Sequence, residues 1–227
     1  SAFFRQNHAD AETLLSAVVN ATNAPVEEVA RAEFYLGDVA AEQTARTPTN
    51  LVEAITHYQR VAREMTNSPM NSVAWGRLGD CHLQLGEFGQ ALAAYQTVTE
   101  LSGADVTTRS QAQLGFAKVL VEQADTTGET DQAENLLQQS LDHCLEIVFG
   151  GNLRSANEKM DPYWVKEAGL MAGRLAKRLG QAEQERKLYT RLAKELPTMP
   201  LWQTKLNVLN GKTNAPAPPK PPRSTAP

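Results

Sequence analysis

Large apolar residues recur at helical spacing along most of this chain. In one stretch the intervals are three or seven residues, which lines one face of an α-helix: Leu78, Leu85, Leu92, Tyr95 and Val98. No part of the sequence shows sustained two-residue alternation rich in β-branched residues, the pattern of a half-buried strand. The spacing therefore predicts an all-α fold.

Prolines divide the chain into a body and a tail. Six of the twelve prolines fall in the last twelve residues, and residues 212–227 are predicted to be a Pro-rich disordered tail. Because proline inside a helix costs about 3 kcal/mol, the other six predict helix boundaries: Pro25, Pro48, Pro69, Pro162, Pro197 and Pro200. Asp161 before Pro162 is typical of an N-cap followed by the first helical residue. In the tail, residues 218–223 fit a PxxPxR ligand pattern, although we favour a spacer.

Residues 72–105 carry the most specific pattern in the chain. Its members are Trp75, Leu78, Gly79, Gly86, Phe88, Ala91, Tyr95 and Val98. In order and spacing they resemble a tetratricopeptide repeat, a pair of helices spanning 34 residues. We interpret Gly79 and Ala91 as small because the two helices cross most closely there, and Gly86 as the turn between them. Since one such hairpin cannot bury its own apolar face, neighbouring repeats must stack on it.

Weaker copies of the pattern lie on both sides. They are centred on Leu36-Gly37, Leu114-Gly115 and Ala172-Gly173, and they place repeats near 30–66, 108–147 and 162–199. The turn around Thr47-Pro48-Thr49 and the one after Thr126 are longer than the family's. The resemblance implies a right-handed superhelical solenoid of antiparallel helix pairs over 30–211. A further helix is expected within residues 1–29, as a cap or as half of a repeat.

Composition and motifs argue against several classes of function. A net charge of −4 and a pI near 5.6 do not suit a nucleic-acid binder. The mean hydropathy of −0.41, with no apolar run of about 18 residues, does not suit a membrane-spanning helix. No nucleophile or phosphate-loop motif is visible. We therefore expect no catalytic residue and no cofactor.

The histidines and cysteines do not form a recognisable metal motif. Cys81-His82 and His143-Cys144 are adjacent pairs, and neighbouring residues on a helix point about 100° apart, so neither pair chelates alone. The spacing typical of zinc sites is missing. We expect no metal and interpret both cysteines as buried apolar residues. A disulfide between them stays an open alternative, because sequence alone does not place their Cα atoms.

The family resemblance also implies where a partner binds. In such repeats the first helices line a concave groove, and the matching positions here are Phe34, Asp38, Arg77, Asp80, Gln84, Arg109, Phe116 and Arg174. The Lys and Asn clamp by which some members hold a C-terminal carboxylate is absent. The mixture of aromatic, acidic and, toward the far end, basic residues suits an extended or helical peptide.

We predict a non-catalytic scaffold that binds a protein or peptide in this groove. The alternatives are a structural or assembly subunit of a cell-envelope complex and a regulatory domain of a larger protein. The uneven turns resemble those of bacterial cell-envelope repeat proteins, which favours the periplasm, with the cytoplasm as the alternative. The oligomeric state stays open.

Overall fold

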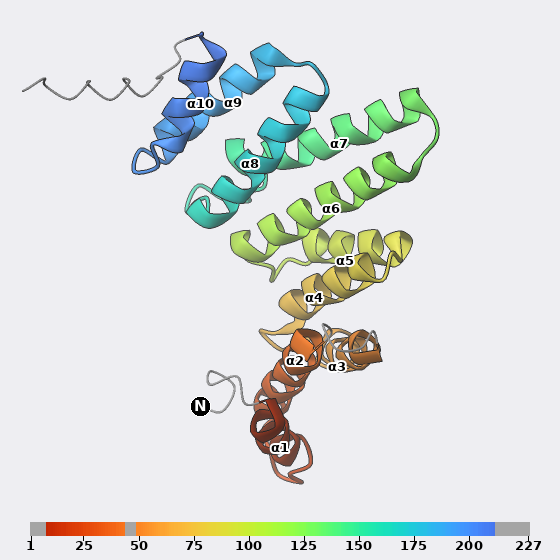
Figure 1. Cartoon of the computed structure of the whole chain (residues 1–227). Helices are drawn as coiled ribbons and strands as arrows, with labels where there is room; N and C mark the ends of the chain where they lie inside the picture. The colour runs from red at the N-terminus through yellow and green to blue at the C-terminus, as the bar shows by residue number, and fades with distance from the viewer. Residues whose placement is uncertain (1–7, 44–48, 212–227) are drawn as a thin grey trace, which may run out of the picture.

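The computed structural model describes residues 8–43 and 49–211, and these residues form α-helices and turns without any strand (Figure 1). In chain order the helices are α1 (His8–Val19), α2 (Val26–Glu42), α3 (Thr49–Glu64), α4 (Asn71–Gln84), α5 (Phe88–Glu100), α6 (Val106–Thr126), α7 (Thr130–Phe149), α8 (Pro162–Arg178), α9 (Ala182–Glu195) and α10 (Leu201–Leu209). The predicted Pro-rich tail and most of the turn around Pro48 lie outside the described residues.

The helices stack in chain order from α1 at one end to α10 at the other (Figure 1). Four pairs, α2–α3, α4–α5, α6–α7 and α8–α9, pack within themselves, and the second helix of each of the first three packs on the first helix of the next pair. The first helices α4, α6 and α8 also contact one another in succession. Helix α1 covers α2, and α10 covers α9. The predicted all-α, solenoid-like stack of helix pairs is confirmed.

Close helix crossings explain the glycine of the central repeat. A Cβ atom added to Gly79 in α4 would lie 2.4 Å from Cε1 of Tyr95 in α5. The Tyr95 ring is fully buried, and its other side meets Gly115 in α6, where an added Cβ would lie 2.3 Å from Cζ. The ring is therefore held between α4 and α6, which both approach it through glycine. The close approach of α4 and α5 at Gly79 agrees with the interpretation of that glycine.

The same contact recurs in the first and fourth pairs. An added Cβ on Gly37 would lie 2.5 Å from Cε1 of Tyr58, and one on Gly173 would lie 2.3 Å from the hydroxyl oxygen of Tyr189. Both tyrosines are buried. In the third pair Leu137 lies on the second helix in place of the tyrosine, and it too is buried. The glycine and tyrosine together set the spacing between first and second helices.

Local signals in the sequence set the helix ends. Gly86, between α4 and α5, has φ +73°, a left-handed conformation that glycine adopts without steric cost. Asp161 is the N-cap of α8, because its carboxylate accepts a hydrogen bond of 2.9 Å from the Tyr163 backbone N–H, and Pro162 occupies the first turn. Both sequence predictions are confirmed.

One carboxylate is buried inside the first helix pair. Glu33 of α2 has no exposed surface and is hydrogen-bonded to His57 Nδ1 at 2.7 Å and to the Arg60 guanidinium. Burial alone would raise the pKa of Glu33, but the hydrogen bonds and positive charge of His57 and Arg60 outweigh it, so the pKa lies below its ordinary value. The pair α2–α3 thus contains a buried, ion-paired carboxylate.

Candidate functional site

The residues that follow the repeat glycines lie on the first helices. They are Asp38, Asp80, Phe116 and Arg174, and we call the surface around them the first-helix face. In the first two repeats this residue is an aspartate that accepts a hydrogen bond from the repeat's tyrosine. Tyr58 donates to Asp38 Oδ1 at 2.6 Å, and Tyr95 donates to Asp80 Oδ1 at 2.8 Å.

Arg77 joins these two aspartates across the repeats. Its Nε donates to Asp38 Oδ1 at 3.2 Å, and its Nη1 lies 3.7 Å from Asp80 Oδ2. Burial alone would lower the pKa of Arg77, but the nearby Asp38 and Asp80 outweigh that effect and raise it. Gln111 of α6 completes the row by donating to Asp80 Oδ2 at 2.9 Å. The structure therefore brings Asp38, Arg77 and Asp80 together, and Arg77 balances one of the two negative charges.

Phe34 and Gln84 lie at opposite extremes of exposure. Phe34 is only 5% exposed, and its ring centroid lies 5.6 Å from that of Tyr58. The Arg77 guanidinium covers it at 5.9 Å, so Phe34 contributes to packing under the first-helix face. Gln84 is the last residue of α4 and is exposed.

Phe116 is the half-buried aromatic of the first-helix face. Its ring stacks on the His143 imidazole with centroids 5.1 Å apart, and it meets the Tyr95 ring at 6.1 Å. Burial lowers the pKa of His143 and outweighs the opposing effect of nearby Glu146 and Asp142, so the imidazole is neutral near pH 7. Phe116 and His143 thus form an uncharged aromatic surface between the acidic row and the basic end of the chain.

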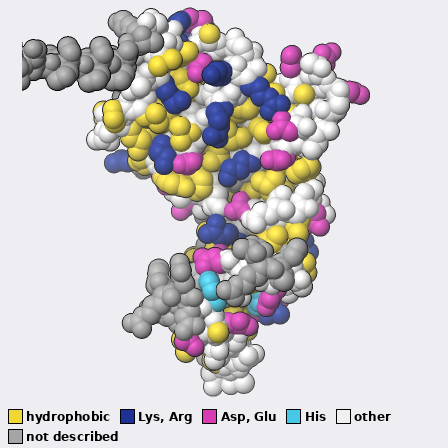
Figure 2. All heavy atoms as spheres, viewed as in Figure 1, with side chains coloured by type: hydrophobic (Ala, Val, Ile, Leu, Met, Phe, Trp, Pro, Cys, Tyr) yellow, Lys and Arg dark blue, Asp and Glu magenta, His cyan; other side chains and the backbone are white. Residues whose placement is uncertain are grey.

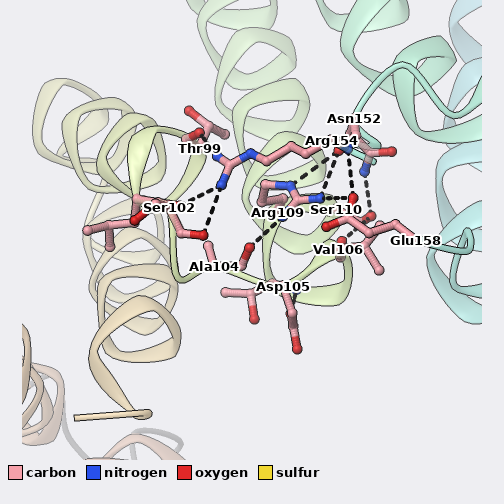
Figure 3. A network of polar contacts seen from close by, with 12 residues as sticks. Thr99, Ser102, Ala104, Asp105, Val106, Arg109, Ser110, Asn152, Arg154 and Glu158 are labelled. Atoms are coloured by element: carbon pink, nitrogen blue, oxygen red, sulfur yellow. Dashed lines mark hydrogen bonds and ion pairs between the residues drawn. The ribbon is translucent and has the colours of Figure 1, made fainter. Parts of the chain in front are cut away.

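Arg109 is buried, with 3% of its surface exposed, and it holds the α7–α8 connection in place (Figure 3). Its Nε and Nη2 donate to the Asn152 carbonyl oxygen at 3.2 and 3.1 Å. Nη2 also donates to Glu158 Oε2 at 2.6 Å, and Nη1 donates to the Ala104 carbonyl oxygen. The guanidinium is therefore occupied by internal partners, which the spacing of residues in the sequence does not reveal.

A second arginine strengthens this connection. Arg154 donates from Nη1 to the Leu101 carbonyl oxygen at 2.7 Å and from Nη2 to the Thr99 carbonyl oxygen. These carbonyls end α5, where a positive charge is favourable. The Arg154 backbone N–H donates to the same Glu158 oxygen as Arg109, at 2.7 Å. Figure 3 shows the two guanidinium groups between the α5–α6 turn and the loop 150–161.

Arg174 is exposed and lines a cavity of about 400 Å³ at the C-terminal end of the first-helix face. The cavity lies between α8, α9 and α10, and its lining is Gly173, Arg174, Lys177, Glu185, Tyr189, Thr204, Lys205, Val208 and Leu209. The sequence analysis did not identify Lys205 or the α10 wall. The sequence feature that indicates α10 is the helical spacing of Trp202 and Leu206, which are the buried residues of this helix.

The comparison with protein families agrees with this geometry. A family model described as a tetratricopeptide repeat matches residues 72–105. Residues 72–105 of the chain form a tetratricopeptide repeat. Comparison with curated proteins gave no significant match. Tetratricopeptide repeats are generally protein-interaction modules and non-catalytic scaffolds.

The two cysteines of the chain lie in its interior. Cys81 and Cys144 are buried and unpaired, and burial raises the pKa of each thiol to about 12. Within residues 8–43 and 49–211, no three His, Cys, Asp or Glu side chains come close enough to hold a metal ion. None of the described helices combines the length and the apolar character needed to cross a membrane.

Proposed function

We propose that the chain is a non-catalytic scaffold that binds a peptide segment of a partner protein along its first-helix face. The observation that carries the proposal is the change in character of the residues after the repeat glycines. Asp38 and Asp80 are hydrogen-bonded within the protein, Phe116 is a half-buried aromatic, and Arg174 is exposed beside a cavity. An apolar contact followed by an available charge fixes both the position and the direction of a bound segment.

The preformed helices support this proposal. The acidic row is held by Tyr58, Tyr95 and Arg77, and Phe116 is supported by His143. A face whose side chains are already held in place loses little conformational entropy when a peptide binds. Phe34 and Arg109 support the first-helix face without contacting a bound peptide, because both are buried and packed against other residues of the scaffold.

Selection from a displayed library of random peptides tests the proposal. Peptides selected on the wild-type protein are measured against Phe116→Ala and against Lys187→Ala, which alters an exposed residue of α9. We expect Phe116→Ala to weaken binding by about tenfold or more, the loss of roughly one well-packed aromatic contact, and Lys187→Ala to leave it unchanged.

Two results would contradict the proposal. The first is that no peptide is selected above background. The second is that every selected peptide binds both variants as tightly as it binds the wild type. Circular dichroism must show the same helix content in all three proteins, because Phe116 also contacts Tyr95 in the core.

A further inference from the structure

We propose that the cavity between α8, α9 and α10 binds the carboxylate of an acidic side chain that lies next to an aliphatic residue in the partner's peptide. This inference rests on the proposed function and names the chemistry of one end of the bound segment. It concerns the three cations of the cavity wall, which are Arg174, Lys177 and Lys205. We call this cavity the C-terminal pocket.

The three cations have charge available for a ligand. In the described part of the chain, none of them forms an ion pair with an acidic side chain, whereas the neighbouring Arg178 pairs with Asp125 at 2.6 Å. Lys205 Nζ lies 5.3 Å from the centre of the Tyr189 ring, so an aromatic face is its main internal contact. At the other end of the face the aspartates are already paired. A charged ligand group therefore gains most at the C-terminal pocket.

The helix packing explains why a cavity forms at this point. In the preceding repeats, the first helices α4, α6 and α8 contact one another directly, but α10 packs on α9 with at most sparse contact with α8. Tyr189 of α9 lines the space between α8 and α10. Basic side chains from α8 and α10 thus face one space from two helices.

The charge balance of the pocket favours a carboxylate over a phosphate. Burial raises the pKa of Tyr189, and the Glu185 carboxylate raises it further, so the hydroxyl stays protonated. Glu185 is 9% exposed and lines the same cavity. Its negative charge opposes a doubly charged anion more strongly than a singly charged one.

The pocket also has an aliphatic side. Val208 and Leu209 of α10 line it, and 62% of the Val208 surface is exposed. Burying an aliphatic side chain of the partner against them contributes affinity that a free anion does not obtain. The mixed lining therefore indicates an acidic residue adjacent to Leu, Val or Ile.

The distribution of charge along the solenoid also favours the C-terminal end as the place where an acidic ligand binds. Residues 162–211 contain nine Lys and Arg against four Asp and Glu, whereas the described residues up to 105 contain four against thirteen. Figure 2 shows Lys and Arg side chains among hydrophobic ones over the part of the visible surface where α8 to α10 lie. This asymmetry steers an acidic segment toward the C-terminal pocket.

Calorimetry with a defined probe tests the proposal. The probe is a synthetic peptide with an amidated C-terminus, in which a central run of alternating Glu and Leu is flanked by Ser residues. The control peptide has Gln in place of every Glu. We expect Lys177→Gln combined with Lys205→Gln to weaken probe binding by about tenfold, because each solvent-accessible charge contact contributes somewhat under 1 kcal/mol. Lys187→Gln combined with Lys194→Gln, on α9, removes the same charge outside the pocket and should change binding less than about twofold.

Three outcomes would overturn the proposal. The first is that the Glu and Gln peptides bind equally well, and the second is that both pairs of substitutions weaken binding equally. The third is that inorganic phosphate displaces the bound probe at the same concentration at which unlabelled probe peptide does. The single variant Lys177→Gln provides a milder check, with a smaller loss expected. If library-selected peptides depend on Phe116 while the pocket variants bind them normally, the proposed function stands and the pocket assignment is wrong.

Discussion

Replacing Gly79 with alanine tests whether the Tyr95 ring is confined between α4 and α6. The new methyl group would lie 2.4 Å from Cε1 of a ring that has no exposed surface. The ring has no room to retreat, because the Gly115 side is as close, at 2.3 Å for an added Cβ. Overpacking of this kind costs about 1–3 kcal/mol. Alanine recovers roughly 1 kcal/mol of helix propensity, so we expect a net loss of up to about 2 kcal/mol.

The same substitution at Gly76 is the matched control. Gly76 lies in the same helix, and an added Cβ there meets nothing within 4 Å. We expect Gly76→Ala to stabilise the protein by about 1 kcal/mol, the propensity gain alone. Urea unfolding followed by far-ultraviolet circular dichroism should therefore move the two midpoints in opposite directions. Stacked repeats can unfold in stages, so tryptophan fluorescence, which reports on Trp75 of α4, Trp164 of α8 and Trp202 of α10, should accompany the measurement.

A double-mutant cycle isolates the contact. In a Tyr95→Leu background the ring is absent, and Gly79→Ala should lose its penalty, which gives an interaction energy of about 1–3 kcal/mol. Equal changes in stability from Gly79→Ala and Gly76→Ala would refute the confinement of Tyr95, and so would a penalty at Gly79 that persists without the ring. Either result would mean that the helix crossing adjusts more freely than the buried geometry indicates.

Two further predictions concern buried charges. Glu33→Gln should destabilise the protein at neutral pH, and because the folded-state pKa of Glu33 lies below its ordinary value of 4.5, the deficit should shrink as the pH falls below 4.5 toward that lower value. Urea midpoints measured across this range check it, and a deficit independent of pH would contradict it. Arg109→Met should free the loop 150–161 and speed tryptic cleavage at Arg154, since the guanidinium bridges the loop to α6. Arg178→Met, which removes an exposed ion pair, should leave that cleavage rate unchanged.

Local interactions made much of the fold predictable. Gly86 adopts a positive φ between helices and Asp161 caps the following helix, and both roles depend on residues only a few positions away. The repeat pattern of 72–105 indicated the pairing of helices, because a glycine in one helix must meet a large residue in the next. The residue of the next repeat that Tyr95 meets, Gly115, was not evident, since that contact links two repeats rather than one.

The candidate site was less predictable, because exposure depends on distant parts of the chain. Phe34 and Arg109 occupy the same kind of helical position as exposed residues do, yet Tyr58 covers one and the loop around Asn152 covers the other. The C-terminal pocket depends on α10, whose contribution of Lys205 no repeat alignment identifies.

The sequence by itself determined the all-α class, the helix ends at Gly86 and Asp161, the pairing of helices into repeats and the positions after each repeat glycine, because these follow from spacing and from contacts between near neighbours. Only the tertiary structure decided which of those positions are available to a partner. Burial and charge neutralisation are set by residues far apart in the chain: 39 positions separate Arg77 from Asp38, and 43 separate Arg109 from Asn152. The first-helix face and its C-terminal pocket are therefore properties of the stacked array as a whole.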